Sequence, residues 1–257
     1  MHLELLEVQR RVQGRIPIPH IDLSPAAVRR HEAEARPLLR FEDIPLELSD
    51  LRLVVRQTAD IMHRFDALDE ADYQHVLTLG RDMALVEVIG RWYRAGADKH
   101  AAAAPLAPGV VADVPADTSM LDQVLGLAMR PFLSRCAELL QQRAELALWT
   151  HSHCALCGGE PDFSVITPAA ERHLICGRCG LRWKFAPLTC PYCRNSDRSR
   201  ITSFATPDGQ YRVYACDVCN RYLKAYDGRR ASRPVMPIVD MVATLPLDAA
   251  AIQRGYQ

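Results

Sequence analysis

The sequence lacks net charge, because 31 Lys and Arg residues are balanced by 31 Asp and Glu residues in a chain of 257. This balance argues against a protein that binds nucleic acid through a generally basic surface. An export signal is also missing: MHLELLEVQRR carries Glu4 and Glu7 where a secretory signal has a basic end and an unbroken apolar run. We therefore expect an intracellular protein.

Long apolar runs and catalytic motifs are missing too. The stretch from Ala101 to Val111 is apolar, but it is too short to span a bilayer and contains Pro105 and Pro108. The sequence has no G-x-S-x-G, P-loop or H-E-x-x-H pattern, and its acidic residues are scattered along predicted helix surfaces. These absences predict a protein that is neither inserted in a membrane nor an enzyme.

Cysteine, by contrast, is present in pairs. A tetrahedral metal site needs four soft donors about 2.3 Å from one ion, and a two-residue gap lets a tight turn aim two sulfurs at one point. Each pair therefore supplies half a site, and eight thiolates suffice for two ions. Four Cys-x-x-Cys motifs fall within 66 residues: Cys154/Cys157, Cys176/Cys179, Cys190/Cys193 and Cys216/Cys219.

Disulfides and redox chemistry are the competing uses of these cysteines. An intracellular compartment keeps thiols reduced, so paired cysteines there more often bind metal than form disulfides. A thioredoxin-type redox pair is expected as one motif at the start of a helix in a βαβ unit, and four successive motifs fit that pattern poorly. Metal ligation is therefore the preferred interpretation.

The spacing between pairs predicts which of them share an ion. The gaps are 18, 10 and 22 residues, and each wide gap leaves room for a strand out and a strand back. FSVI and RHLI form the first predicted hairpin; ITSFAT and YRVYA form the second, across the turn signal Asp208-Gly209. A cross-brace, first pair with third and second with fourth, is the alternative. The hairpins predict a site 1 of Cys154, Cys157, Cys176 and Cys179, and a site 2 of Cys190, Cys193, Cys216 and Cys219.

The residue after each pair bears on the shape of the turn. Gly158 and Gly180 follow the first two pairs and Asn220 follows the fourth, and these residue types adopt a positive φ readily. Arg194 follows the third pair, so that turn is expected to be less regular. Four thiolates suit zinc and rubredoxin-like iron equally well, and in both cases losing one Cys should unfold its ribbon locally.

The cysteine-rich region has more basic than acidic residues. From Cys154 to Arg233 there are 13 Lys and Arg residues and 7 Asp and Glu residues, a surplus of six positive charges. Two divalent ions, each held by four thiolates, offset about four of these charges. That weakens, without removing, the alternative of a nucleic-acid-binding ribbon whose phosphate contacts would be Arg198, Arg200, Arg229, Arg230 and Arg233.

The residues before Thr150 are predicted to form helices. The helix expected after Ser49 and Asp50 has a partly apolar face, which is assigned to Leu53, Arg56, Asp60, Ile61 and Phe65. The helix expected from Ser119 to Trp149 should kink or restart at Pro131. The predicted helices run through Leu3 and Glu7, after Ser24 and Pro25, after Ser49 and Asp50, from Ala71 to Ala95, and from Ser119 to Trp149.

The predicted fold class is α+β, with an N-terminal helical bundle followed by two tandem small β ribbons of the rubredoxin or zinc-ribbon kind. The predicted parts are a helical domain over 1–150, a first metal ribbon over 151–188, a second over 189–233, and a tail over 234–257 that packs on the others. His151 and His153 at the boundary are alternative ligands, although eight cysteines already complete two sites. Cys136 is expected to be a small buried hydrophobe rather than a reactive thiol.

The motif set as a whole resembles the formate dehydrogenase accessory proteins of the FdhE family. The matching segments lie in the second half of the chain, and the first 120 residues contain no comparably diagnostic stretch. In order they are AMRPFLSRCAELL at 128–140, CALCGGEP at 154–161, RHLICGRCGLRWKF at 172–185, CPYCRNS at 190–196, YACDVCNRYLKAYD at 214–227 and DMVATLPLDAAAIQRGY at 240–256.

The resemblance implies a cytoplasmic maturation factor, chaperone-like in action, that is needed for active formate dehydrogenase and contacts its catalytic subunit before twin-arginine export. It favours rubredoxin-type iron at both sites, with zinc as the alternative, and an iron-based redox role on the client is the competing function. Aromatic and basic residues around the cysteine turns are favoured as interface anchors. Trp183 and Tyr222 have a second interpretation, packing the two ribbons together. The candidate contact residues are Trp183, Tyr192, Arg194, Arg221, Tyr222 and Lys224.

Overall fold

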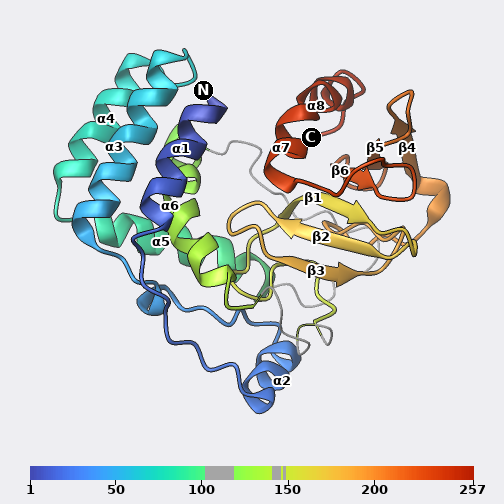
Figure 1. Ribbon diagram of the computed structural model, residues 1–257, viewed down its shortest axis with the longest axis horizontal. Helices are drawn as coiled ribbons and strands as arrows, with labels where there is room; N and C mark the ends of the chain where they lie inside the picture. The colour runs from blue at the N-terminus through green and yellow to red at the C-terminus, as the bar shows by residue number, and fades with distance from the viewer. Residues whose placement is uncertain (102–118, 141–145, 147–148) are drawn as a thin grey trace.

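The computed structural model describes residues 1–101, 119–140, 146 and 149–257, and in these the chain forms a helical region followed by a six-stranded sheet (Figure 1). The α+β fold class is confirmed. None of the described helices is long and apolar enough to cross a membrane. The helices of the first region are α1 (His2–Gln13), α2 (Pro25–Ala33), α3 (Leu48–Arg64), α4 (Glu70–Arg81), α5 (Leu85–Ala101) and α6 (Met120–Ala137), with a 3-10 turn over Phe41–Asp43.

Side-chain caps begin several of these helices. Ser24 accepts a hydrogen bond from the amide of Ala27 at the start of α2, and Asp69 does the same for the amide of Asp72 in α4. Ser119 and Asp122 form a reciprocal capping box at the start of α6. Helices α1, α3 and α6 pack on one another and α4 packs on α3, so the apolar faces of α1, α3 and α6 meet in one core.

The structure corrects three expectations about these helices. The single helix expected from Ala71 to Ala95 is two helices, because Asp82 is extended and its carboxylate accepts the amide of Ala84 at 2.8 Å. Helix α5 also continues beyond Gly96. Helix α6 passes through Pro131 and ends at Ala137, and the expected continuation over 141–145 and 147–148 lies outside the described residues.

The apolar face assigned to α3 is also wrong. Phe65 is 45% exposed and Arg56 is exposed, whereas the buried side chains begin at Leu51 and recur at spacings of three and four residues. Of the five residues assigned, only Ile61 belongs to the buried face. The packing of α1 and α6 selects this face, whose members are Leu51, Val54, Val55, Thr58, Ala59, Ile61 and Met62.

The six strands form one sheet rather than two separate ribbons. The two predicted hairpins, β1 with β2 and β4 with β5, are both present and antiparallel. The strands β1, β2 and β3 form one hairpin unit, and β4, β5 and β6 form the other. The two units are joined by a parallel pairing of β1 with β6, in which Phe163 is opposite Lys224 and Ser164 is opposite Ala225. The strands, in the spatial order β3-β2-β1-β6-β5-β4, are β1 (Pro161–Ile166), β2 (Arg172–Cys176), β3 (Arg182–Phe185), β4 (Ile201–Ala205), β5 (Tyr211–Cys216) and β6 (Tyr222–Asp227).

The C-terminal segment forms two short helices, α7 (Pro237–Ala243) and α8 (Leu245–Ile252). Helix α8 lies on β5 and β6, where Ala251 packs with Val213 and Ala215. Figure 1 shows α7 and α8, in red, above the strands β1, β2 and β3. The buried carboxylate of Asp240 fixes α7, because it accepts hydrogen bonds from the hydroxyl of Tyr211 at 2.7 Å and from Arg233.

Asp227, at the end of β6, anchors the turn that follows the sheet. Its side chain is fully buried and accepts hydrogen bonds from Arg229 at 2.8 Å and Arg212 at 2.9 Å. These bonds, of which the one from Arg229 has the largest effect, hold the pKa of the Asp227 carboxyl at about 2. The carboxyl is therefore ionised at neutral pH.

We expect Asp227→Asn to lower the free energy of unfolding at pH 7 by about 2 kcal/mol, because two charge-assisted hydrogen bonds to a buried acceptor are weakened. The matched control is Glu171→Gln, which removes the charge from an exposed pair with Lys184. That change should cost no more than about 0.5 kcal/mol. Urea unfolding of the metal-loaded protein, followed by circular dichroism, measures both. Equal effects would mean that the Asp227 network contributes no more than a surface ion pair.

Candidate metal centres

The four Cys-x-x-Cys turns share one backbone geometry. In each turn the residue after the second cysteine donates its amide to the carbonyl of the first, at 3.0 Å for Gly158, Gly180 and Arg194 and 2.8 Å for Asn220. All four residues have a positive φ: 70°, 73°, 59° and 55° in the same order. The expectation that Arg194 makes the third turn less regular is therefore wrong. The closing bond uses only backbone atoms, so a non-glycine residue completes it by adopting the left-handed conformation.

The turns bring the sulfurs together in two groups of four, each from successive pairs. One group is Cys154, Cys157, Cys176 and Cys179; the other is Cys190, Cys193, Cys216 and Cys219, and within each group the sulfurs lie within 4.8 Å of one another. The pairs are those predicted from the hairpins, and the cross-brace is not formed.

The spacing of the sulfurs fits a metal. Opposing sulfurs are 3.5 Å apart in the first group, and 3.6 and 3.7 Å apart in the second. A tetrahedral ion with bonds of about 2.3 Å would have ligands about 3.8 Å apart. The two clusters could therefore hold two metal ions, and their all-sulfur donor sets suit zinc and iron alike.

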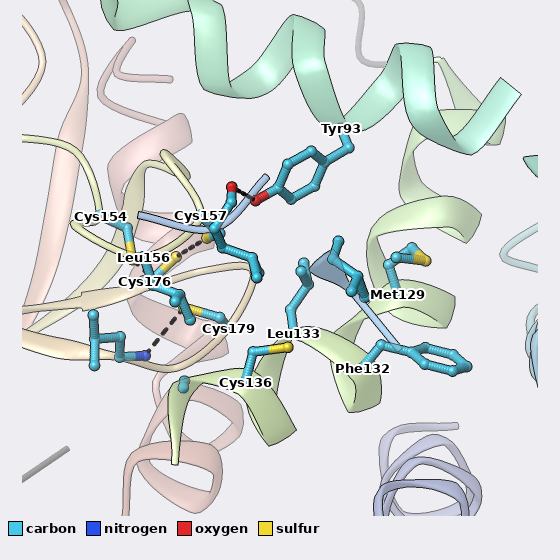
Figure 2. Packing of buried hydrophobic residues seen from close by; sticks show 14 of the residues in the cluster. Tyr93, Met129, Phe132, Leu133, Cys136, Cys154, Leu156, Cys157, Cys176 and Cys179 are labelled. Carbon is cyan, nitrogen blue, oxygen red and sulfur yellow. Dashed lines mark hydrogen bonds between the residues drawn. The ribbon is translucent and has the colours of Figure 1, made fainter. Parts of the chain in front are cut away.

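Site 1 lies inside the core that the helical region and the sheet share. Its four cysteines are buried, and Figure 2 shows them beside Tyr93 of α5 and the side chains of Leu133 and Cys136 on α6. The loop before α3 pairs with the first turn: Leu38 and Leu39 donate their amides to the carbonyls of Ala155 and Leu156 at 2.8 and 2.9 Å. The Tyr93 hydroxyl donates to the Leu39 carbonyl at 2.8 Å. Site 1 is thus held by elements from both halves of the chain.

Arg178, inside the second turn, docks site 1 onto α5. Its guanidinium carbon lies 4.2 Å from the centroid of the Trp92 ring, and Nη1 donates to the Tyr93 carbonyl at 3.4 Å. The arginine fits because Gly96 has no side chain: a Cβ at that position would lie 2.0 Å from Nη2 of Arg178. Gly96 is therefore a packing residue.

Electrostatics in site 1 favour a cation. Burial raises the pKa of Cys154 and Cys179 well above the ordinary value, whereas hydrogen bonds from Cys154 and the other thiols lower the pKa of Cys157. Of these three thiols, Cys157 is the one that its neighbours help to ionise, whereas burial opposes ionisation of Cys154 and Cys179. A bound cation supplies the charge that lets all four sulfurs ionise.

Site 2 is more accessible than site 1. Cys193 is exposed and Cys219 is half-buried, whereas Cys190 and Cys216 are buried. A hydrogen bond from the Cys219 thiol lowers the pKa of Cys190 to about 5. The Asn195 amide lies 3.8 Å from the sulfur of Cys216, a donor from the turn itself. Solvent reaches two ligands of site 2 and none of site 1.

Two of the candidate contact residues connect the ribbons to each other. Arg221 donates a hydrogen bond from each Nη atom to the Glu160 carboxylate, at 2.7 and 3.1 Å, and its guanidinium lies 3.6 Å from the centroid of the Tyr192 ring. The Tyr192 hydroxyl donates to the Pro161 carbonyl at 3.0 Å. The second ribbon contributes Tyr192 and Arg221, the first Glu160 and Pro161. Sequence reasoning assigned the packing between ribbons to Trp183 and Tyr222 and missed this contact.

The other candidates have different surroundings. Trp183 is 2% exposed in the core shared with site 1, and its Nε1 donates to the His151 carbonyl at 3.0 Å, so it is no surface anchor. Tyr222 and Lys224 hold α8, donating to the Asp248 carboxylate at 2.7 and 2.6 Å. Arg194 is exposed and makes no hydrogen bond through its side chain with the described residues. Tyr192, Arg221, Tyr222 and Lys224 all line one groove of about 530 Å³.

The residues weighed as alternative ligands lie outside both clusters. His151 donates to the Glu32 carbonyl at 2.8 Å, and Nε2 of His153 lies 3.1 Å from the Ala35 carbonyl, so both histidines fasten the boundary segment to the end of α2. Cys136 is buried, and burial raises the pKa of its thiol to about 12. Cys136 therefore packs as an apolar side chain, as expected.

Several of the basic residues considered for nucleic acid are engaged within the protein. Arg229 pairs with Asp227, Arg233 pairs with Asp240, and Arg200 donates to the Asp217 carbonyl at 3.1 Å. Arg198 and Arg230 are exposed. The geometry thus leaves fewer cations for phosphate than the sequence suggested.

We expect Gly158→Ala to destabilise the protein more than Gly180→Ala. Both glycines have φ near 70°, so either alanine is strained by about 1–2 kcal/mol. A Cβ at Gly158 would also lie 2.8 Å from Cα of Ala97 and from Cγ of Pro37, whereas no described atom lies within 4 Å of one at Gly180. The overpacking should add about 1–3 kcal/mol. Urea unfolding of the two variants tests this; equal losses would contradict the close docking of the first turn on α5.

We also expect a chelator to remove the ion from site 2 before that of site 1, because only site 2 has ligands that solvent reaches. Colorimetric release with a pyridylazo chelator should be biphasic, at one ion per phase. The fast phase should vanish in Cys219→Ser, and the slow phase should remain. A single phase for both ions in the unaltered protein would refute the difference in access.

Comparisons with known proteins identify the fold. No protein-family model matches the sequence, and no curated protein matches it. Among solved structures, the crystal structure of the FdhE protein from Pseudomonas aeruginosa matches with a TM-score of 0.58 at 20% sequence identity. The match covers 98% of this chain and 83% of that one. The helical region, the sheet and the two cysteine clusters therefore make up an FdhE-like fold, as the resemblance of the motifs implied.

Proposed function

We propose that this protein is a cytoplasmic accessory factor of the FdhE family that is required to mature formate dehydrogenase and that binds its catalytic subunit. The observation that carries the proposal is the FdhE-like fold over 98% of the chain. The ordered set of four Cys-x-x-Cys motifs, which resembles that family independently of the structure, supports it.

The role proposed is not catalytic. Each cluster offers four sulfur donors to one ion, whereas a hydrolytic zinc keeps one position open for water. In the proposed role the ions stabilise a rigid surface, because ligation of a structural ion contributes on the order of 10–16 kcal/mol to the folding of small metal ribbons. The resemblance favours iron of the rubredoxin type over zinc, and the eight cysteines are its proposed ligands.

A redox role is the second candidate, and the exposure of Cys193 and Cys219 favours it. One-electron cycling needs an iron that a partner can approach, and site 2 offers that approach. The visible spectrum of protein purified without air separates the two functions. A rubredoxin-like absorbance that bleaches on reduction would support electron transfer, and a spectroscopically silent zinc protein would leave only the structural role.

The principal test is recovery of formate dehydrogenase in cells that lack this gene. The unaltered gene should restore formate-dependent dye reduction, and a tagged copy should co-purify with the catalytic subunit. Arg194→Ala should reduce that recovery about five-fold, because Arg194 is exposed and uncommitted and such a loss corresponds to about 1 kcal/mol.

The matched control is Arg29→Ala, an exposed arginine on α2. It should leave recovery unchanged, and both variants should keep two ions per chain. Undiminished recovery with Arg194→Ala would remove Arg194 from the interface. Failure of the unaltered gene to restore activity or recover the subunit would refute the proposed function.

A further inference from the structure

A groove of about 530 Å³ separates the helical region from the C-terminal helices. One wall is formed by α1 and α6, the other by α7 and α8, and the sheet provides the floor through the start of β1 and of β6. Figure 1 shows α1 and α6 on one side and α7 and α8 on the other, with β1 below α7. A volume of this size suits a ligand or a short polypeptide segment.

Both walls are apolar. Leu5, Leu6 and Leu127 line the helical side, and Ile238, Val242 and Leu245 line the opposite side. Further apolar side chains are exposed in the segment of α7 and α8 without lining the groove. Of the eleven large apolar side chains exposed in the described chain, six lie between residues 236 and 252: Met236, Ile238, Val239, Val242, Leu245 and Ile252.

The extent of this strip favours a polypeptide over a small ligand. Met236, Val239 and Ile252 are 46%, 52% and 61% exposed and do not line the groove. A small molecule that filled the groove would leave them in water, whereas a polypeptide lying along α7 and α8 would cover them. Contiguous exposed apolar patches rimmed by polar groups are typical of protein-binding sites.

The charges in the groove favour an uncharged occupant. Three cations and three carboxylates line it, and four of these six groups are committed to one another: Arg221 to Glu160, and Lys224 to Asp248. Arg130 of α6 and Asp162 of β1 remain; they attract each other electrostatically, but no hydrogen bond joins their side chains. The groove thus presents one guanidinium and one carboxylate whose hydrogen-bonding atoms do not bond to each other and whose charges balance.

A donor and an acceptor of this kind match the carbonyl and the amide of peptide groups. In a helix the interior peptide groups are already paired, so an extended segment is the form that offers both. Apolar side chains on such a segment would lie against the two walls.

We propose that this groove and the adjoining strip on α7 and α8 bind an extended, uncharged apolar segment of the client polypeptide. Asp162 accepts from its backbone amides and Arg130 donates to its carbonyls. The inference rests on the proposed function, in which the client is the catalytic subunit of formate dehydrogenase.

Site-specific photo-cross-linking during co-expression with that subunit tests the proposal. Benzoylphenylalanine replaces Val242 in the groove or, as the control, Val86 on α5; both valines are 37% exposed. We expect an adduct with the catalytic subunit from position 242 and none from position 86. Mass spectrometry should place the adduct in an apolar segment of the subunit without charged residues. Adducts within the chain, between two copies of it, or at a charged segment would overturn the proposal.

Variants supply a second measurement. Val242→Asp should reduce recovery of the catalytic subunit at least ten-fold, and Val86→Asp should not. Arg130→Gln should reduce recovery about three-fold while leaving the fold unchanged, because the Arg130 side chain makes no hydrogen bond to the described residues; two ions per chain and an unaltered thermal midpoint verify folding. Full recovery of the catalytic subunit with Val242→Asp and Arg130→Gln would overturn the proposal that the groove binds the client, and would leave the proposed function standing. No recovery with the unaltered protein would overturn both the proposed function and the groove proposal.

Discussion

The requirement that four sulfurs meet in the buried interior at site 1 shapes much of the molecule. Helix α5, the loop through Leu38 and Leu39, and the first two cysteine turns all pack around that point. A structural ion contributes on the order of 10–16 kcal/mol, which is comparable to the net stability of an ordinary domain, about 5–15 kcal/mol. An ion at site 1 would therefore couple the helical region and the sheet through its ligands, and site 1 belongs to the core that both parts share rather than to a small ribbon.

The two centres differ although their turns are alike. The backbone bonds and positive φ values recur in all four turns, so the local sequence determines the geometry of ligation. The surroundings determine access. Site 1 is covered by α5 and α6, whereas site 2 has an exposed Cys193 at the edge of the molecule. One protein thus combines a centre suited to holding its core together with a centre that a partner can approach.

The sequence was sufficient for local features and insufficient for contacts between distant segments. Hairpin spacing predicted both groups of cysteines, because a strand out and a strand back must fit in the gap. The parallel pairing of β1 with β6 leaves no comparable signal, since Phe163 and Lys224 are brought together only by packing. Likewise, the buried face of α3 depends on which neighbours cover it, and residues such as Arg56 and Phe65 were misassigned for that reason. The third turn was misjudged for a different reason. Arginine rarely adopts a positive φ, but the backbone hydrogen bond that closes the turn holds Arg194 in that conformation.

The strand order β3-β2-β1-β6-β5-β4 places the first strand of one hairpin unit against the last strand of the other, at the centre of the sheet. Neither unit is complete alone, because β1 without β6 would present an unpaired edge bearing Phe163 and Val165. Such edges recruit other strands and aggregate. During synthesis, the first unit emerges from the ribosome before β6 exists, so the nascent chain passes through a stage with an open apolar edge. The parallel contact that joins the ribbons can therefore close this edge only after β6, which ends at Asp227, has been made.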